Sequence, residues 1–143
     1  MTIHKKGQAH WEGDIKRGKG HISTESGALN QQPYGFNTRF EGKPGTNPEE
    51  LIGAAHSACF SMALSLILGE AGYTPESIDT VADVSLDKVG EGYKITKVAL
   101  QSEVTLPGIE EGEFESLINK AKAGCPVSQL INADITLDYK LHN

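Results

Sequence analysis

The most extended apolar pattern in the chain is the uncharged 18-residue stretch from Leu51 to Leu68. Asn47 and Pro48 precede this run in the order typical of a helix start, and Glu50 stands three residues after Asn47, as in a capping box. The pattern predicts a helix from Asn47 to about Glu70. Apolar side chains occupy nearly every face of this helix, which is typical of a helix buried in a protein core.

Alternation of apolar and polar residues predicts strands on both sides of the long helix. In the first forty residues, alternating segments are joined by a glycine-rich turn, and Phe36 and Phe40 flank polar positions at strand spacing. Residues 77–106 contain two alternating runs separated by Val-Gly-Glu-Gly, which predicts an antiparallel hairpin. A last alternating run, residues 133–141, predicts one more strand.

Two further helices are predicted between the hairpin and the last strand. Residues 109–124 place apolar side chains on one helical face and end at a glycine, and residues 125–131 fit a short helix. The order β-β-β-α-β-β-α-α-β favours an α+β fold, and the length predicts a single domain, residues 1–143. Two small sheets can cover only part of a helix that is apolar all round. We therefore expect a homodimer in which a second copy covers the rest.

Charge and composition exclude several classes of protein. The formal net charge of −6 argues against a nucleic-acid partner, because phosphate contacts need clustered lysines and arginines. The apolar run reaches the length of a membrane span, but it contains a histidine and several serines and directly follows two glutamates. We therefore expect no membrane association. The polar start of the sequence lacks the pattern of a secretory signal, which predicts a cytoplasmic location.

The chain has only two cysteines, Cys59 within the apolar helix and Cys125 before the short helix. Their wide separation excludes a Cys-x-x-Cys redox motif and a zinc ribbon. Small apolar neighbours are expected to raise the pKa of the Cys59 thiol, which leaves it a packing residue unless a cation is supplied from elsewhere. The Cys125 sulfur is expected near free N–H groups at a helix start, which favour a thiolate. On these local grounds Cys125 is the better nucleophile, with a structural thiol as the alternative.

Arginine is the candidate cation, because a guanidinium stays charged when it is buried. The chain has two arginines. Arg39 lies on the predicted strand before the long helix and Arg17 lies in a lysine-rich turn, which favours Arg39. Glu49 can hold this arginine through paired hydrogen bonds, although its place in the first helical turn is also explained by the helix dipole.

His56 stands one helical turn before Cys59. It can be a satisfied core residue, a general base or a metal ligand. With Cys59 and Cys125 it would supply three ligands for zinc. The sequence therefore leaves a zinc site open as an alternative to thiol chemistry.

The motifs around both cysteines resemble those of the OsmC/Ohr family of hydroperoxide-reducing proteins. The likeness extends over essentially the whole chain, and its most specific parts are the Asn-Pro-Glu helix start, the Ala-Cys-Phe that follows and the later Gly-Cys-Pro-Val-Ser. The resemblance implies an intertwined homodimer in which antiparallel β-sheets wrap long central helices, with active sites at the subunit interface.

The resemblance also implies roles for individual residues. The family's reacting cysteine is the one in the Ala-Cys-Phe helix, here Cys59, and its disulfide partner is Cys125, which reverses the local ranking of the two thiols. An arginine holds the reacting thiolate, and the glutamate of the Asn-Pro-Glu motif, here Glu49, orients that arginine. The OsmC branch takes the arginine from the segment before the long helix, here Arg39, whereas the Ohr branch takes it from the first hairpin, here Arg17.

The implied chemistry is the reduction of organic hydroperoxides to alcohols in stress defence. Cys59 is oxidised to a sulfenic acid, Cys125 condenses with it, and a lipoyl-type or other dithiol reduces the resulting disulfide. No cofactor is required, because the sulfur itself accepts the oxygen atom. The apolar residues around Cys59 favour organic hydroperoxides over hydrogen peroxide, since they can bind an alkyl or aryl tail.

Two other classes of function remain open on the sequence alone. One is a zinc-binding protein that uses His56, Cys59 and Cys125. The other is a non-catalytic stress protein whose cysteines only pack or crosslink. The peroxidase reading requires the two cysteines to meet in the fold, with Cα atoms within about 7 Å of each other.

Overall fold

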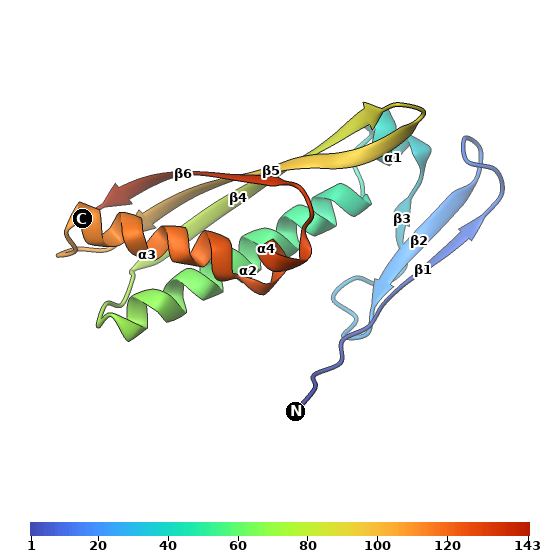
Figure 1. Cartoon of the computed structure of the whole chain (residues 1–143). Helices are drawn as coiled ribbons and strands as arrows, with labels where there is room; N and C mark the ends of the chain where they lie inside the picture. Colours follow the sequence, from blue (N-terminus) through green and yellow to red (C-terminus); the bar gives the residue numbers. More distant parts are fainter. The chain divides into compact units, whose positions relative to one another are not determined.

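The computed structural model describes residues 1–143, and the chain divides into two compact units, Met1–Leu51 and Ile52–Asn143. The first unit contains a three-stranded antiparallel sheet in the order β1-β2-β3, drawn in blue to cyan in Figure 1. Its strands and short helix are β1 (Gly7–Glu12), β2 (Lys19–Thr24), β3 (Gln32–Tyr34) and α1 (Phe36–Phe40). The predicted hairpin in the first part of the chain is confirmed.

The strand predicted around Phe36 and Phe40 is wrong, because these residues form the helix α1. The Thr38 hydroxyl accepts a hydrogen bond from the Gly35 N–H over 3.0 Å, which stabilises the first turn. The two phenylalanine rings lie four residues apart on one helical face, with ring centroids 4.9 Å apart. The spacing of four residues between Phe36 and Phe40 is therefore that of one helical turn. Arg39 accordingly lies on a helix and not on a strand.

The long helix α2 (Pro48–Glu70) begins and ends as the sequence predicts. The Asn47 side chain accepts the Glu50 N–H over 2.9 Å and so caps the first turn. After the last turn, Gly72 adopts a φ of 91°, and the Tyr73 N–H donates to the Leu68 carbonyl over 2.9 Å. This is the type of ending that glycine favours.

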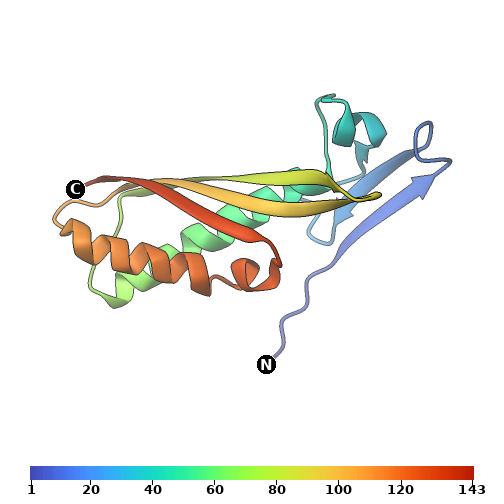
Figure 2. The ribbon, with the colours of Figure 1, turned by 45° about the horizontal axis from the view of Figure 1, so that its top comes forward.

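The second unit contains a sheet in the order β4-β5-β6, visible as the yellow-green, yellow and red strands of Figure 2. β4 and β5 form the predicted antiparallel hairpin. β6 pairs with β5 in parallel, so the expectation of purely antiparallel sheets is wrong for this strand. The reason is the helical connection, because a crossover through helices returns the chain in the same direction. The elements are β4 (Ser77–Val89), β5 (Gly92–Thr105), α3 (Glu111–Gly124), α4 (Pro126–Leu130) and β6 (Asp134–His142).

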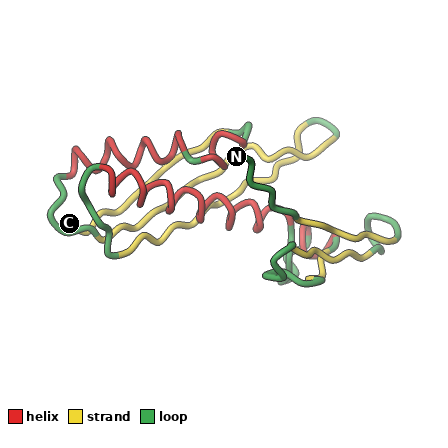
Figure 3. The backbone as a smooth tube through the Cα atoms, turned by 90° about the horizontal axis from the view of Figure 1, so that it is seen from below, coloured by secondary structure: helices red, strands yellow, loops and turns green.

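The core of the second unit lies between this sheet and its helices. Figure 3 shows α2 and α3 side by side against the strands. The buried cluster draws on α2, β5 and α3, and it includes Phe60, Leu64, Leu68, Val98, Leu100, Phe114 and Ile118. Cys125 belongs to the same cluster, and Cys59 packs against it. The predicted α+β fold is thus confirmed, with both cysteines at its core.

Another part of α2 carries large apolar side chains that are not buried in the core of the second unit. Met62 is 75% exposed and Leu66 is 64% exposed. By length and composition alone, α2 would also be able to cross a membrane, a property that it shares with core helices of soluble proteins. Its buried residues, from Gly53 to Leu68, instead pack into the core of the fold.

Gly53 allows α2 to approach β4 closely, and this contact yields a test. A Cβ atom at Gly53 would lie 2.9 Å from the Ala82 carbonyl oxygen, whereas one at Gly69 would meet nothing within 4 Å. We expect Gly53→Ala to lower the free energy of unfolding by about 1 kcal/mol, because strain at the contact exceeds the gain in helix propensity. Gly69→Ala should raise it by up to about 1 kcal/mol. Urea denaturation of both variants measures the difference, and equal stabilisation would contradict the close contact.

Candidate functional site

The two cysteines meet in the core of the second unit. Cys59 lies on α2 and is half-buried, whereas Cys125 lies between α3 and α4 and is fully buried. Both are free thiols, and Cys125 lies close enough to Cys59 to help raise the pKa of the Cys59 thiol. The fold thus brings together two side chains that are far apart in the sequence, as a disulfide between them would require.

The surroundings of Cys59 keep its thiol protonated. Burial raises the pKa of the Cys59 thiol, a hydrogen bond with the Val127 backbone opposes this, and the neighbouring Cys125 raises the pKa further. None of these causes is a positive charge. The prediction that apolar neighbours leave Cys59 unactivated is therefore confirmed for this unit, and a thiolate at Cys59 requires a cation from outside it.

Cys125 takes part in a hydrogen-bond chain that begins at the start of α4. Its sulfur accepts the Ser128 N–H over 3.3 Å and caps this short helix, as predicted from its position. The Cys125 thiol also donates to the Ser128 hydroxyl over 3.2 Å. Sequence reasoning missed Ser128. The signal was its place three residues after Cys125, because the residue three positions after a helix cap is the one whose N–H the cap binds.

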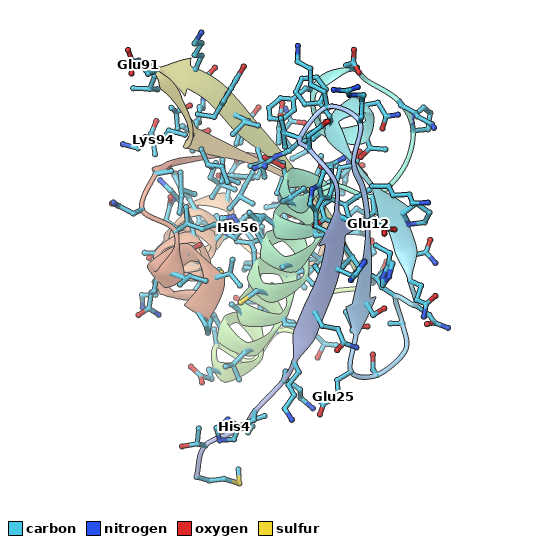
Figure 4. The ribbon with its side chains drawn as sticks, turned by 90° about the vertical axis from the view of Figure 1, so that its right-hand side faces the viewer. His4, Glu12, Glu25, His56, Glu91 and Lys94 are labelled. Carbon is cyan, nitrogen blue, oxygen red and sulfur yellow. The ribbon has the colours of Figure 1, made fainter.

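His56 continues this chain from α2. Its Nε2 lies 2.7 Å from the Ser128 hydroxyl oxygen, while its buried Nδ1 has no hydrogen-bond partner. Figure 4 shows His56 between α2 and the C-terminal helices. Burial lowers the pKa of His56, so the imidazole is neutral at physiological pH. No three histidine, cysteine or carboxylate side chains are grouped to hold a metal ion, so His56, Cys59 and Cys125 do not form the zinc site that the sequence left open.

Within the first unit, Arg39 and Glu49 form a close ion pair. Arg39 Nε donates to both carboxylate oxygens of Glu49, over 2.8 and 3.2 Å, and a terminal nitrogen of Arg39 lies 2.8 Å from Glu49 Oε1. The Glu49 side chain is only 11% exposed. Arg17 pairs instead with Asp14 over 3.2 Å, and its side chain is 90% exposed. Glu49 therefore fixes the orientation of Arg39. Arg17, in contrast, lies in a solvent-exposed turn.

Comparison with known proteins assigns the chain to a family. The family model described as OsmC-like protein matches residues 40–140. This chain belongs to the OsmC family. The matched region contains Glu49, Cys59 and Cys125, and it begins one residue after Arg39.

Two relatives and one solved structure extend this family assignment. The chain is 78% identical over 141 residues to "Peroxiredoxin OsmC" of Escherichia coli, covering 99% of both sequences. It is 31% identical over 124 residues to "Organic hydroperoxide resistance protein OhrB" of Bacillus subtilis, covering 85% of this chain and 89% of OhrB. The crystal structure of that OhrB matches with a TM-score of 0.70 at 27% identity, over 94% of this chain and 98% of OhrB. Both sequence and fold thus place the chain among OsmC and Ohr proteins.

Proposed function

We propose that this protein is a thiol-dependent peroxidase that reduces organic hydroperoxides to alcohols. The observation that carries the proposal is that the Cys59 and Cys125 side chains lie together at the core. Similarity over 99% of the chain to a peroxiredoxin of the OsmC family, and over 85% of the chain to an organic hydroperoxide resistance protein, supports the same reaction. The physiological role that follows from this activity is defence against peroxide stress.

In the proposed reaction, the Cys59 thiolate attacks the terminal oxygen of the hydroperoxide. The O–O bond breaks, the alcohol leaves, and Cys59 becomes a sulfenic acid. Cys125 then condenses with this sulfenic acid, which releases water and forms the Cys59–Cys125 disulfide. A lipoyl-type or other dithiol returns both cysteines to thiols by exchange.

Arg39 is the proposed cation that stabilises the Cys59 thiolate, with Glu49 as the residue that orients it. Two observations support this role. Glu49 holds the Arg39 guanidinium by several short hydrogen bonds. The pKa of the Cys59 thiol is raised, and no positive charge in its own unit acts to lower it. In this proposal residues 1–143 act as a single OsmC-like domain.

Oxidation of the thiols provides the direct test of the reaction. After one equivalent of cumene hydroperoxide, we expect the reduced protein to lose both thiols to one Cys59–Cys125 disulfide, because the two side chains are neighbours in the core. Cys125→Ser should instead retain sulfenic acid at Cys59. Mass spectrometry with a sulfenic-acid trap measures both products. Survival of both thiols with the peroxide unconsumed would leave the cysteines as packing residues.

The role of Arg39 is tested by comparing Arg39→Gln with Arg17→Gln. Without its cation, Cys59 keeps the pKa that burial raises, so the thiolate fraction at pH 7 falls about tenfold for each unit of that rise. We expect Arg39→Gln to consume peroxide at least about tenfold more slowly at pH 7 and to recover as the pH increases. Arg17→Gln should match the wild type. The opposite ranking in stopped-flow measurements would transfer the role to Arg17.

We further propose a cytoplasmic homodimer in which a second copy covers the exposed apolar side chains of α2. Met62 and Leu66 support this, because two large exposed apolar residues one helical turn apart form a surface that water does not favour. The family resemblance of the motifs also implies an intertwined dimer with its active sites at the interface.

Replacement of this apolar surface tests the dimer. We expect the wild type to sediment as a dimer and Met62→Asp/Leu66→Asp to sediment as a monomer, because buried carboxylates oppose association. Val89→Asp is the matched control, since Val89 is also half-exposed, at 52%, but lies at the tip of the β4–β5 hairpin. A monomeric wild type at micromolar concentration in sedimentation velocity would rule the dimer out.

A further inference from the structure

A hydrogen-bond chain connects the Cys125 thiol to a buried imidazole. It runs from Cys125 Sγ to the Ser128 hydroxyl over 3.2 Å, and from that hydroxyl to His56 Nε2 over 2.7 Å. All three side chains lie in the second unit and are buried, with exposures of 0% for Cys125, 7% for Ser128 and 0% for His56. Nothing in the peroxidase reaction described above uses Ser128 or His56.

The hydrogen bonds have a consistent direction. The Cys125 thiol donates its hydrogen to the Ser128 oxygen, so the Ser128 hydrogen is free to point at His56 Nε2. Nε2 then acts as an acceptor, and the ring proton resides on Nδ1, the nitrogen that has no partner. The lone pair on Nε2 can therefore take up the Ser128 proton, and Nδ1 keeps its own hydrogen throughout.

His56 has no other visible task in the core. A buried imidazole nitrogen without a partner costs free energy, which is tolerated most readily at functional sites. The ring is tied to the protein through a single hydrogen bond, and that bond goes to the serine that contacts Cys125. The neutral ring described above is in the state that accepts a proton.

We propose that Ser128 and His56 form a proton relay that removes the proton from Cys125 as its sulfur attacks the oxidised Cys59. The inference rests on the proposed peroxidase function, because only that reaction requires a buried Cys125 to become a nucleophile. Ser128 contacts the reacting sulfur directly. His56 acts through Ser128 and is therefore a positioning residue.

The atoms and electrons of the step balance. The Cys125 proton passes to the Ser128 oxygen while the Ser128 proton passes to His56 Nε2. The freed electron pair on Cys125 forms the S–S bond, and the S–O bond of the Cys59 sulfenic acid breaks. Hydroxide leaves and takes a proton from solvent to become water, and His56 returns its proton to solvent. Cys125 is oxidised, and the Cys59 sulfur is reduced from sulfenic acid to disulfide.

Few other charges surround the relay. α2 contributes Cys59 and His56, and α4 carries no ionisable side chain. The β5 residues that share the core cluster with Cys125, such as Val98 and Leu100, are uncharged. The charged residues of α3 lie at exposed or half-buried positions: Glu111, Glu113, Glu115, Lys120 and Lys122. Because Cys125 is fully buried, hydroxide and buffer bases have little access to its thiol. A proton acceptor inside the protein therefore has the most effect on this step.

Single-turnover kinetics of the reduced protein with cumene hydroperoxide separate the two chemical steps. Peroxide consumption reports the attack by Cys59, and quenched samples report sulfenic acid and disulfide. We expect Ser128→Ala to consume peroxide at the wild-type rate but to form the disulfide about a hundredfold more slowly, with sulfenic acid accumulating. His56→Gln should behave in the same way, because its side chain can fill the space but cannot take up the proton.

The pH dependence distinguishes a relay from simple loss of position. Without the relay, the Cys125 proton must pass to hydroxide or another base from solvent, so disulfide formation by Ser128→Ala should accelerate as the pH rises, by up to about tenfold per pH unit. The wild type should vary much less over the same range. Ser128→Thr restores the hydroxyl and is the matched control, expected to recover the wild-type rate and pH profile. Ser128→Ala is the smallest change in this core, and far-UV circular dichroism checks that it folds.

Every other outcome would contradict either the proton relay or the proposed peroxidase reaction. Disulfide formation by Ser128→Ala at the wild-type rate, or slowed by one factor at every pH, would overturn the relay. Slower peroxide consumption in the same variant would also overturn it, since the relay acts only after Cys59 is oxidised. A wild type that consumes no peroxide would instead overturn the proposed function itself.

Discussion

The close packing of α2 against the sheet and helices of the second unit is the constraint on which the candidate site depends. α2 presents Phe60, Leu64 and Leu68 to the core, and on neighbouring positions it presents His56 and Cys59 to the start of α4. Gly53 permits this approach, because any side chain there would strike the Ala82 carbonyl. The apolar core and the thiol chemistry therefore share one helix surface. A shift of α2 against the sheet would therefore move Cys59 relative to Cys125.

Most of the fold was predictable from local patterns in the sequence. The long helix, the hairpin over residues 77–106 and the two later helices all follow from short-range periodicity and caps, which act within a few residues. The segment Phe36–Phe40 was misread because apolar residues spaced by four are compatible with both a strand and a single helical turn. The parallel pairing of β6 was missed for another reason. It is set by the path of the crossover and leaves no local signature.

The candidate site was predictable in its residue types but only partly in its connections. The raised pKa of Cys59 and the capping role of Cys125 follow from burial and helix-start rules. The Arg39–Glu49 pair was anticipated as one of two readings for Glu49, and the ion pair is present. The contact between His56 and Ser128 joins residues 72 positions apart, so only the tertiary structure reveals it. The zinc hypothesis failed for the same reason, because ligand spacing along one helix does not specify where the third ligand points.

The long chain segment between Cys59 and Cys125 also affects when the two thiols can meet during folding. Contacts between distant parts of a chain form late, because the entropy of closing a long loop must be overcome first. Cys59 and Cys125 belong to opposite ends of such a loop, which contains the whole β4–β5 hairpin and α3. We therefore expect the two cysteines to meet only after most of the core has assembled, so that the disulfide forms in the folded protein.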